Sequence, residues 1–414
     1  FDQLTLKTSI IDLEEDVVGF WGAPRLLPTI SKSKRNVLFI CVDSLRSDFI
    51  GLYGDVDAMP VFSELARDGL SYDHFVSAGN GTRYSQTALF TGNYTGQNGL
   101  HLETVYDRLS DNFRKQFAET VPTLPGLFRD HGYLTFASID NPFLLPGATG
   151  LHMGFSQIYN DGVEEGAYRL TTSRTIEFLK ENHSAPFFAF VHYDPDFLWK
   201  LRAYKEGTLS QRMLKSAYYY ELESINAEVE MMLQFLKHGG VYDDTDIVLF
   251  SDHGESLDPQ RPGHGFTLDP DQVIVPLVYK PVRLERSRHG VRISTPVSTV
   301  DLAPLLAEAH NLPVPPSFVG LPESVLGDNE QDRVIYSEGL NDHRLLILNK
   351  TGTYLLYKDG KDEYFGPEPH SEALPDYRIL ATRFLVNSVP GLYLWLNSPQ
   401  KGDDSRHVQI KGAR

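Results

Sequence analysis

A carboxylate and an imidazole directly follow an apolar run in Ile247–Ser256, which reads IVLFSDHGES. Four apolar residues that favour strands lead towards Asp252 and His253, so both side chains are expected at the carboxyl end of a buried strand. Ligands bind at that end of the strands in open α/β sheets. A hard oxygen donor beside a borderline nitrogen donor suits a divalent cation. On its own, the pair is also typical of a loop in which the two side chains satisfy each other.

A second apolar run, NVLFICV at Asn36–Val42, leads into Asp43. Continuous runs of this kind are typical of central strands in a parallel sheet, which are buried on both faces. The sequence therefore places a second carboxylate at a strand end, and we expect Asp43 to join Asp252 and His253 in holding a metal ion. The alternative is that Asp43 caps the helix that follows.

A hydroxyl group is predicted at the start of a short helix in the stretch GNGTRYSQTALFTG, residues 79–92. The glycines favour a tight turn, and the segment from Tyr84 to Phe90 has room for a helix before Gly92. Free backbone N–H groups and the helix dipole favour an anion there, so Thr82 would face a bound phosphate or sulfate. Because a hydroxyl is a weak nucleophile at its ordinary pKa, Thr82 would need the metal ion for activation, and its oxygen is expected to be a fourth ligand of that ion beside Asp43, Asp252 and His253.

Together, these segments resemble the sulfatase family of the alkaline phosphatase superfamily. The similarity runs in the family's order from about Asn36 to Pro316, through VLFICVDSLRSDFIGLYG, DAMPVFSELARDGLSYDHFVSAG, the Thr82–Gly92 stretch, DDTDIVLFSDHGESL, VIVPLVYKP and VSTVDLAPLLAEAHNLPVPP. The resemblance implies an α/β fold, an alkaline-phosphatase-like sandwich with a mostly parallel central sheet and a small C-terminal α+β subdomain. It also implies a metal-dependent hydrolase that acts on an ester bond of a small anionic molecule.

The nucleophile position departs from the family's pattern. Sulfatases carry C/S-x-P/A-S/A-R shortly before Thr-Gly, and the leading Cys or Ser is oxidised to formylglycine. Counting back from Thr91-Gly92 places Thr82 at the leading position and Gln86 at the arginine. A threonine cannot become formylglycine, and the only cysteine, Cys41, lies in the first strand. Threonine at this position resembles the phosphodiesterase and phosphotransferase branches, which predicts phosphorus chemistry.

The resemblance leaves the number of metal ions open at one or two. Ser44 follows Asp43 where sulfatases carry a second Asp, and the phosphodiesterase branch also has a single Asp there. That branch holds a second ion with Asp-x-x-x-His and a later His-Gly, for which Asp196 and His264 are the candidates. Lys200 occupies the His position of that motif, and Asp196 also fits a contact with a cationic substrate group or a side chain that points away. The ion is expected to be Zn, Mn, Mg or Ca.

The predicted mechanism is in-line attack by Thr82 on phosphorus, which gives a phosphothreonine that water then cleaves. His264 is expected to protonate the leaving group, although a turn histidine held by a backbone carbonyl fits the sequence as well. Arg83 and Ser85 are expected to bind the phosphate oxygens. Three alternatives stay open: transfer to an alcohol acceptor, sulfate cleavage without formylglycine, and a non-catalytic family member that keeps the metal.

Composition limits the remaining possibilities. The 414 residues suit a lead-in over residues 1–35, a catalytic α/β domain over 36–330, and a C-terminal subdomain with an antiparallel sheet over 331–414. The net charge of -17 argues against a nucleic-acid partner, and no apolar run is long enough to span a membrane. The single cysteine excludes an internal disulfide and favours a cytoplasmic location, whereas the start at Phe1 leaves room for a removed N-terminal signal. The sequence does not indicate the oligomeric state.

Two local patterns are also clear. Apolar residues at helical spacing predict a helix from about Leu214 to Leu236, which Gly239-Gly240 would end. The segment RLLILNKTGTYLLYKDGKDEYF predicts antiparallel strands with turns at Thr351-Gly352 and Asp359-Gly360.

Overall fold

The central layer is an eight-stranded sheet with the strand order β10-β2-β9-β7-β1-β6-β4-β5. It belongs to a computed structural model that describes residues 35–98, 120–141, 144, 154–160, 166–182, 185–195, 198–327, 333–339, 344–349, 352–356, 362–365 and 380–381. In the spatial order given above, the strands are Val291–Ile293, Leu70–Tyr72, Leu277–Lys280, Thr245–Phe250, Asn36–Val42, Phe187–Tyr193, Leu134–Ile139 and Gln157–Asn160. Strand β9 runs antiparallel to both neighbours, and the other pairs are parallel. The predicted α/β fold with a mostly parallel sheet is confirmed.

The central strands bury both of their faces in hydrophobic cores. On β1, Leu38 and Ile40 face one core, while Phe39 and Cys41 face the other. Successive side chains of a strand point to opposite faces, so burial on both sides requires the unbroken apolar run seen in the sequence.

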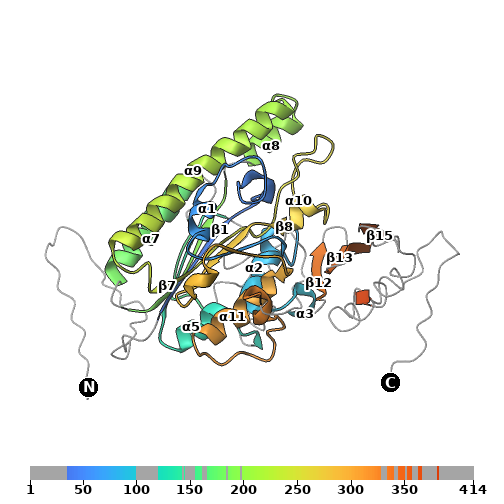
Figure 1. Ribbon diagram of the computed structural model, residues 1–414. Coiled ribbons are helices and arrows are strands. Elements are labelled where there is room, and N and C mark those ends of the chain that lie inside the picture. The colour runs from blue at the N-terminus through green and yellow to red at the C-terminus, as the bar shows by residue number, and fades with distance from the viewer. Residues whose placement is uncertain are drawn as a thin grey trace, which may run out of the picture.

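Helices cover each face of the sheet (Figure 1). The first core is closed by α1 (Val61–Ala66), α7 (Ala167–Asn182) and α9 (Gln211–His238), with α8 (Leu198–Lys205) beside α9. The second core is closed by α2 (Thr82–Thr91), α5 (Leu124–Asp130) and α11 (Leu302–Ala309). The helix predicted over 214–236 is confirmed within α9, which starts after the N-cap Ser210 and ends at Gly239.

Short elements connect these layers. They are η1 (Ser47–Phe49), α3 (Thr95–Asn98), α10 (Pro270–Val273), η4 (Arg286–Arg288), η5 (Thr299–Asp301), α12 (Pro322–Val325) and a small sheet of β11 (Val297–Ser298), β3 (Phe75–Val76) and β8 (Ile274–Val275). Among the described helices, none combines the length and the apolar character that crossing a bilayer requires.

A separate four-stranded sheet follows near the C-terminal end. Its strands β12 (Ile335–Gly339), β13 (Arg344–Asn349), β14 (Gly352–Leu356) and β15 (Asp362–Phe365) pair antiparallel in chain order, which confirms the predicted antiparallel strands. Thr351 and the predicted turn at Asp359-Gly360 lie outside the described residues. The buried Arg333 guanidinium forms an ion pair with the buried Asp301 of η5, and Glu338 N donates to Ala78 O at 3.0 Å. The ion pair ties the residues before β12 to η5, and the hydrogen bond ties β12 to the segment that leads into α2. The boundaries 1–35, 36–330 and 331–414 remain predictions.

Candidate active site

Four neighbouring parallel strands, β7, β1, β6 and β4, end at one edge of the central sheet. An acidic residue follows each of them: Asp43 after β1, Asp140 after β4, Asp194 after β6 and, two residues past its end, Asp252 after β7. Buried carboxylates are costly unless cations or hydrogen-bond donors surround them. A cation bound at this edge of the sheet would therefore offset the cost of burying these carboxylates.

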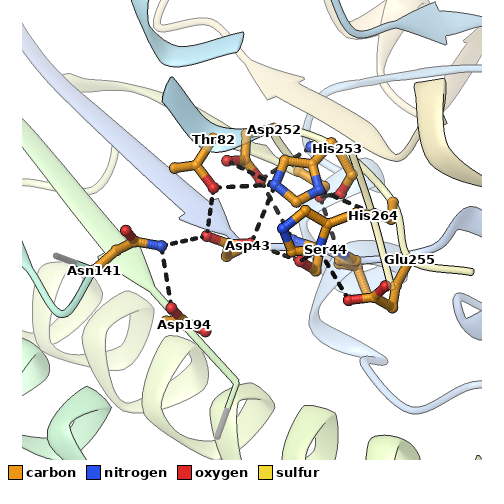
Figure 2. A network of polar contacts seen from close by, with 12 residues as sticks. Asp43, Ser44, Thr82, Asn141, Asp194, Asp252, His253, Glu255 and His264 are labelled. Atoms are coloured by element: carbon orange, nitrogen blue, oxygen red, sulfur yellow. Dashed lines mark hydrogen bonds and ion pairs between the residues drawn. The ribbon is translucent and has the colours of Figure 1, made fainter. Parts of the chain in front are cut away.

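The Thr82 hydroxyl lies between two of the predicted metal ligands (Figure 2). Its Oγ1 is 3.0 Å from Asp43 Oδ2 and 3.0 Å from His253 Nε2. Asp43 Oδ2 also accepts a hydrogen bond of 2.8 Å from Asn141 Nδ2, and Asp43 Oδ1 accepts one of 2.7 Å from Ser44 Oγ. The structure thus brings the predicted nucleophile to the predicted metal ligands.

The orientation of the His253 ring is fixed by the backbone. Its Nδ1 lies 2.9 Å from Gly254 O, and since a carbonyl only accepts hydrogen bonds, Nδ1 must carry the proton. In the neutral ring, Nε2 then presents its lone pair to Thr82 and Asp43. Burial works against ionisation of Asp252, but the neighbouring His253 and His192 outweigh it and hold the pKa of Asp252 below its usual range.

Asp43, Asp252 and His253 form a donor set that fits a divalent cation. Each offers one ligand atom, and these atoms lie within 4.8 Å of one another. Asp252 Oδ2 is buried and has no hydrogen-bond partner among the described residues, as expected for an atom that faces an ion. Two carboxylates balance the charge of a divalent ion, and an imidazole beside them suits zinc or manganese.

Thr82 is the first residue of α2. The N-cap is Gly81 in an extended conformation, Ser85 N donates to Gly81 O, and Gly92 ends the helix at a φ of 57°. Tyr84 N also donates to Gly81 O, at 3.0 Å, and the positive end of the helix dipole at this start favours an anion beside the Thr82 hydroxyl. Thr82 is buried to 5% exposure, which shields its oxygen from bulk water.

His264 lies against this group, with its ring centroid 4.2 Å from that of His253. Its Nδ1 is 3.0 Å from Glu255 Oε2 and 3.4 Å from Ser44 Oγ. Burial lowers the pKa of His264, but the negative charge of Glu255 outweighs this and raises it to about 9. The structure thus brings His264 to the other predicted residues, and Glu255 holds its ring.

A sequence model of the sulfatase family matches residues 35–312, which is more than half of the chain. The chain belongs to the sulfatase family. It is therefore an ester-cleaving hydrolase of a family that uses divalent metal ions, as the resemblance implied. A comparison with curated proteins finds no significant match.

Solved structures share the fold of this sulfatase-family chain. The phosphonate monoester hydrolase SpPMH from Silicibacter pomeroyi superposes with a TM-score of 0.69 at 16% identity, over 87% of this chain and 96% of that one. The phosphonate monoester hydrolase of Agrobacterium radiobacter gives 0.63 at 17% identity, over 86% and 95% of the two chains. A 2-O GAG sulfatase gives 0.66 at 17% identity, over 86% and 92%.

The sulfatase-family site contains residues that the sequence reasoning missed. Asn141 Nδ2 bridges Asp43 Oδ2 and Asp194 Oδ2, at 2.8 and 3.1 Å. Asp140 Oδ1 accepts from Asp194 N at 2.8 Å. The available signal was the run LTFASIDN, in which an apolar strand ends in Asp-Asn as the other strands end in Asp.

These extra carboxyl groups resist ionisation at the crowded edge. Burial raises the pKa of Asp140 to about 6. Burial, with the nearby Asp43 and Asp140, raises the pKa of Asp194 well above its usual range. A cation bound beside them would favour their ionised forms.

Ser44 stands where the family's second Asp would be, and it has a structural role here. Its φ of 58° is unusual for a residue other than glycine and turns the chain at the end of β1. Tyr218 Oη donates to Ser44 O at 2.7 Å, and Ser44 N donates to Asp252 Oδ1 at 3.4 Å.

The remaining predicted residues are less closely tied to the site. Arg83 and Ser85 are buried in the first turn of α2, and their contact with a substrate stays a prediction. Asp196 lies outside the described residues, so the predicted second site at Asp196 and His264 is untested. Lys200 Nζ is 3.8 Å from Glu221 Oε1 of α9, which gives this lysine a partner on the helical layer.

Proposed function

We propose that this sulfatase-family hydrolase cleaves a phosphate ester, a diester or a monoester, through a phosphothreonine at Thr82. The observation that carries the proposal is the position of Thr82 Oγ1, 3.0 Å from both Asp43 Oδ2 and His253 Nε2 at the start of a helix. A metal ion held by Asp43, Asp252 and His253 would lower the pKa of the hydroxyl and offset the charge of the phosphate.

In the first step, Thr82 Oγ forms a bond to phosphorus as the bond to the leaving oxygen breaks. Asp43 orients the hydroxyl, whose proton is lost to solvent, and the positive end of the α2 dipole favours the negative charge on the phosphate oxygens. His264 gives its Nε2 proton to the leaving oxygen, since Glu255 holds Nδ1 at 3.0 Å.

In the second step, His264 Nε2 takes a proton from water, and the water oxygen bonds to phosphorus as the Thr82 O–P bond breaks. Thr82 Oγ1 then regains a proton from solvent. An alcohol in place of this water would make the protein a phosphotransferase through the same intermediate. Sulfate esters fit less well because the side chain of threonine cannot form an aldehyde hydrate, which leaves direct attack on sulfur as the only route from Thr82.

The experiment compares p-nitrophenyl phosphate, bis-p-nitrophenyl phosphate, p-nitrophenyl phenylphosphonate and p-nitrophenyl sulfate as substrates. Each is tested with metal-depleted protein and after addition of Zn²⁺, Mn²⁺, Mg²⁺ or Ca²⁺. Thr82→Val removes the hydroxyl at nearly constant volume, and Thr82→Ser is the matched control that keeps a hydroxyl.

We expect metal-dependent turnover of a phosphate ester, reduced by about 10³-fold or more in Thr82→Val and largely kept in Thr82→Ser. When wild-type protein is quenched with acid during turnover of the phosphate ester, peptide mass spectra should show a phosphoryl group on Thr82. Turnover of the sulfate alone, or full activity in Thr82→Val, would contradict the proposal.

A further inference from the structure

A second group of side chains that could bind a metal ion lies on strands β1 and β6 and just after the end of β7. Cys41 of β1 and His192 of β6 are paired in the parallel register of these strands, so their side chains lie side by side on one face. Asp252 reaches the same place from the end of β7. Cys41 Sγ, one His192 ring nitrogen and one Asp252 oxygen lie within 4.8 Å of one another.

The His192 ring is held as a metal-binding imidazole usually is. Its Nδ1 lies 3.4 Å from Asp140 Oδ1, the arrangement in which Nδ1–H donates a hydrogen bond to a carboxylate and Nε2 is left to bind the metal. Nε2 is fully buried and has no hydrogen-bond partner in the part of the chain that the structure describes. It lies 3.9 Å from Asp252 Oδ2, which is also without a hydrogen-bond partner there.

The cysteine has a supporting contact as well. Gln86 Nε2 of α2 donates to Cys41 Sγ at 3.1 Å, a hydrogen bond that stabilises sulfur when it carries negative charge. Gln86 is neutral and fully buried, so it adds no positive charge that would repel an ion at this position. Two atoms that have no hydrogen-bond partner among the described residues, His192 Nε2 and Asp252 Oδ2, thus lie close to the Cys41 thiol in a buried position.

We propose that Cys41, His192 and Asp252 bind a second, thiophilic divalent cation, most simply Zn²⁺. A thiolate, an imidazole and a carboxylate are the donors that zinc takes in proteins, whereas Mg²⁺ and Ca²⁺ require oxygen ligands. The thiol proton passes to solvent as the Sγ–metal bond forms. This site shares Asp252 with the site at Thr82 and does not depend on the chemistry proposed for Thr82.

The burial of the site defines how it must be loaded. All three side chains are fully buried, so the ion is expected to enter while the chain folds. Loading is therefore best done during expression or refolding.

The competing explanation is that a protonated His192 serves as the counter-ion for the carboxylates. Burial lowers the pKa of His192, but Cys41, Asp140 and Asp252 outweigh this and raise it well above its usual range. That arrangement holds no ion at Cys41 and gives no metal–sulfur bond. The two explanations differ in one observable, a sulfur ligand on the metal.

The experiment measures that bond directly in the full chain, expressed once with Zn²⁺ and once with Co²⁺. Cys41 is the only cysteine of the chain, so any thiolate-to-cobalt charge-transfer band or zinc–sulfur distance near 2.3 Å must come from it. We expect the band in wild-type protein, two ions per chain and, since one cysteine serves one of two zinc ions, an average of about half a sulfur neighbour per zinc in X-ray absorption.

Variants test the assignment further. Cys41→Ser should lose the band and one ion, and His192→Gln should weaken binding of the sulfur-bound ion by about 100-fold. If these variants do not fold, the wild-type X-ray absorption spectrum decides, because it needs no substitution. Zinc with only nitrogen and oxygen neighbours, or cobalt protein without the band, would overturn the proposal.

Discussion

Replacement of Asp252 by Asn should remove most of the stabilisation that metal ions give to this protein. Asp252 Oδ1 accepts from His253 N at 3.0 Å, a bond that an Asn oxygen can keep. Oδ2 has no hydrogen-bond partner among the described residues, so the substitution of NH₂ for this oxygen removes a charge and a metal ligand without a lost hydrogen bond. The response to metal therefore isolates the ligand role of Asp252.

The magnitude follows from mass action. At a free metal concentration of 100 times the dissociation constant, binding stabilises the folded protein by about 2.7 kcal/mol. Loss of a charged ligand should weaken binding by about 100-fold, at the upper end of what supporting residues contribute. At the same concentration, the stabilisation of Asp252→Asn is then only about 0.4 kcal/mol. For 414 residues, the unfolding entropy is about 0.9 kcal/mol/K, so Tm should rise by about 3 °C in wild type and about 0.5 °C in the variant.

The assay is thermal unfolding of metal-depleted protein during a metal titration. Asp243→Asn is the matched control, because Asp243 is exposed near the opposite end of β7. The control should keep the full wild-type rise in Tm. An equal rise in Asp252→Asn and wild type would refute the assignment of Asp252 as a metal ligand.

Three further predictions concern the leaving group, the opposite end of β7 and the C-terminal sheet. His264→Gln should lower kcat by about 10²–10⁴-fold for an alkyl phosphate ester but far less for a p-nitrophenyl ester, whose leaving group needs no proton; equal losses would argue against a general acid. Asp246→Asn should lower the free energy of unfolding by about 3 kcal/mol at pH 7, since it breaks the buried 3.0 Å contact with His310 Nε2. Burial works against ionisation of Asp246, but His310 outweighs it and lowers the pKa, so this stability is present above about pH 4 and is lost at lower pH. Urea titrations should therefore show that the difference in the free energy of unfolding between wild type and Asp246→Asn becomes smaller in acid. A difference that stays constant with pH would contradict this. Arg333→Met leaves Asp301 buried without its ion-pair partner and should cost about 3–5 kcal/mol; proteolysis that cuts the variant no faster than wild type would show that the pair does not hold the sheet.

Local patterns in the sequence were enough to find the first parts of the site. The runs that end at Asp43 and at Asp252-His253 predicted strands β1 and β7, because continuous apolar stretches are what a doubly buried strand requires. The glycine turn placed Thr82 at a helix start, since Gly81 and Gly92 bound that helix in the sequence as they do in α2. Each of these features depends on residues that are close together along the chain.

The tertiary structure decided which side chains meet. Strand β1 lies between β7 and β6, and β6 lies beside β4, an order that no local pattern carries. That order sets Cys41 beside His192 and brings Asn141 to Asp43. Pairing between distant strands depends on the packing of the whole sheet, whereas strand formation depends on the run itself, so the sequence alone predicted the strand ends and the fold alone assembled them into a site.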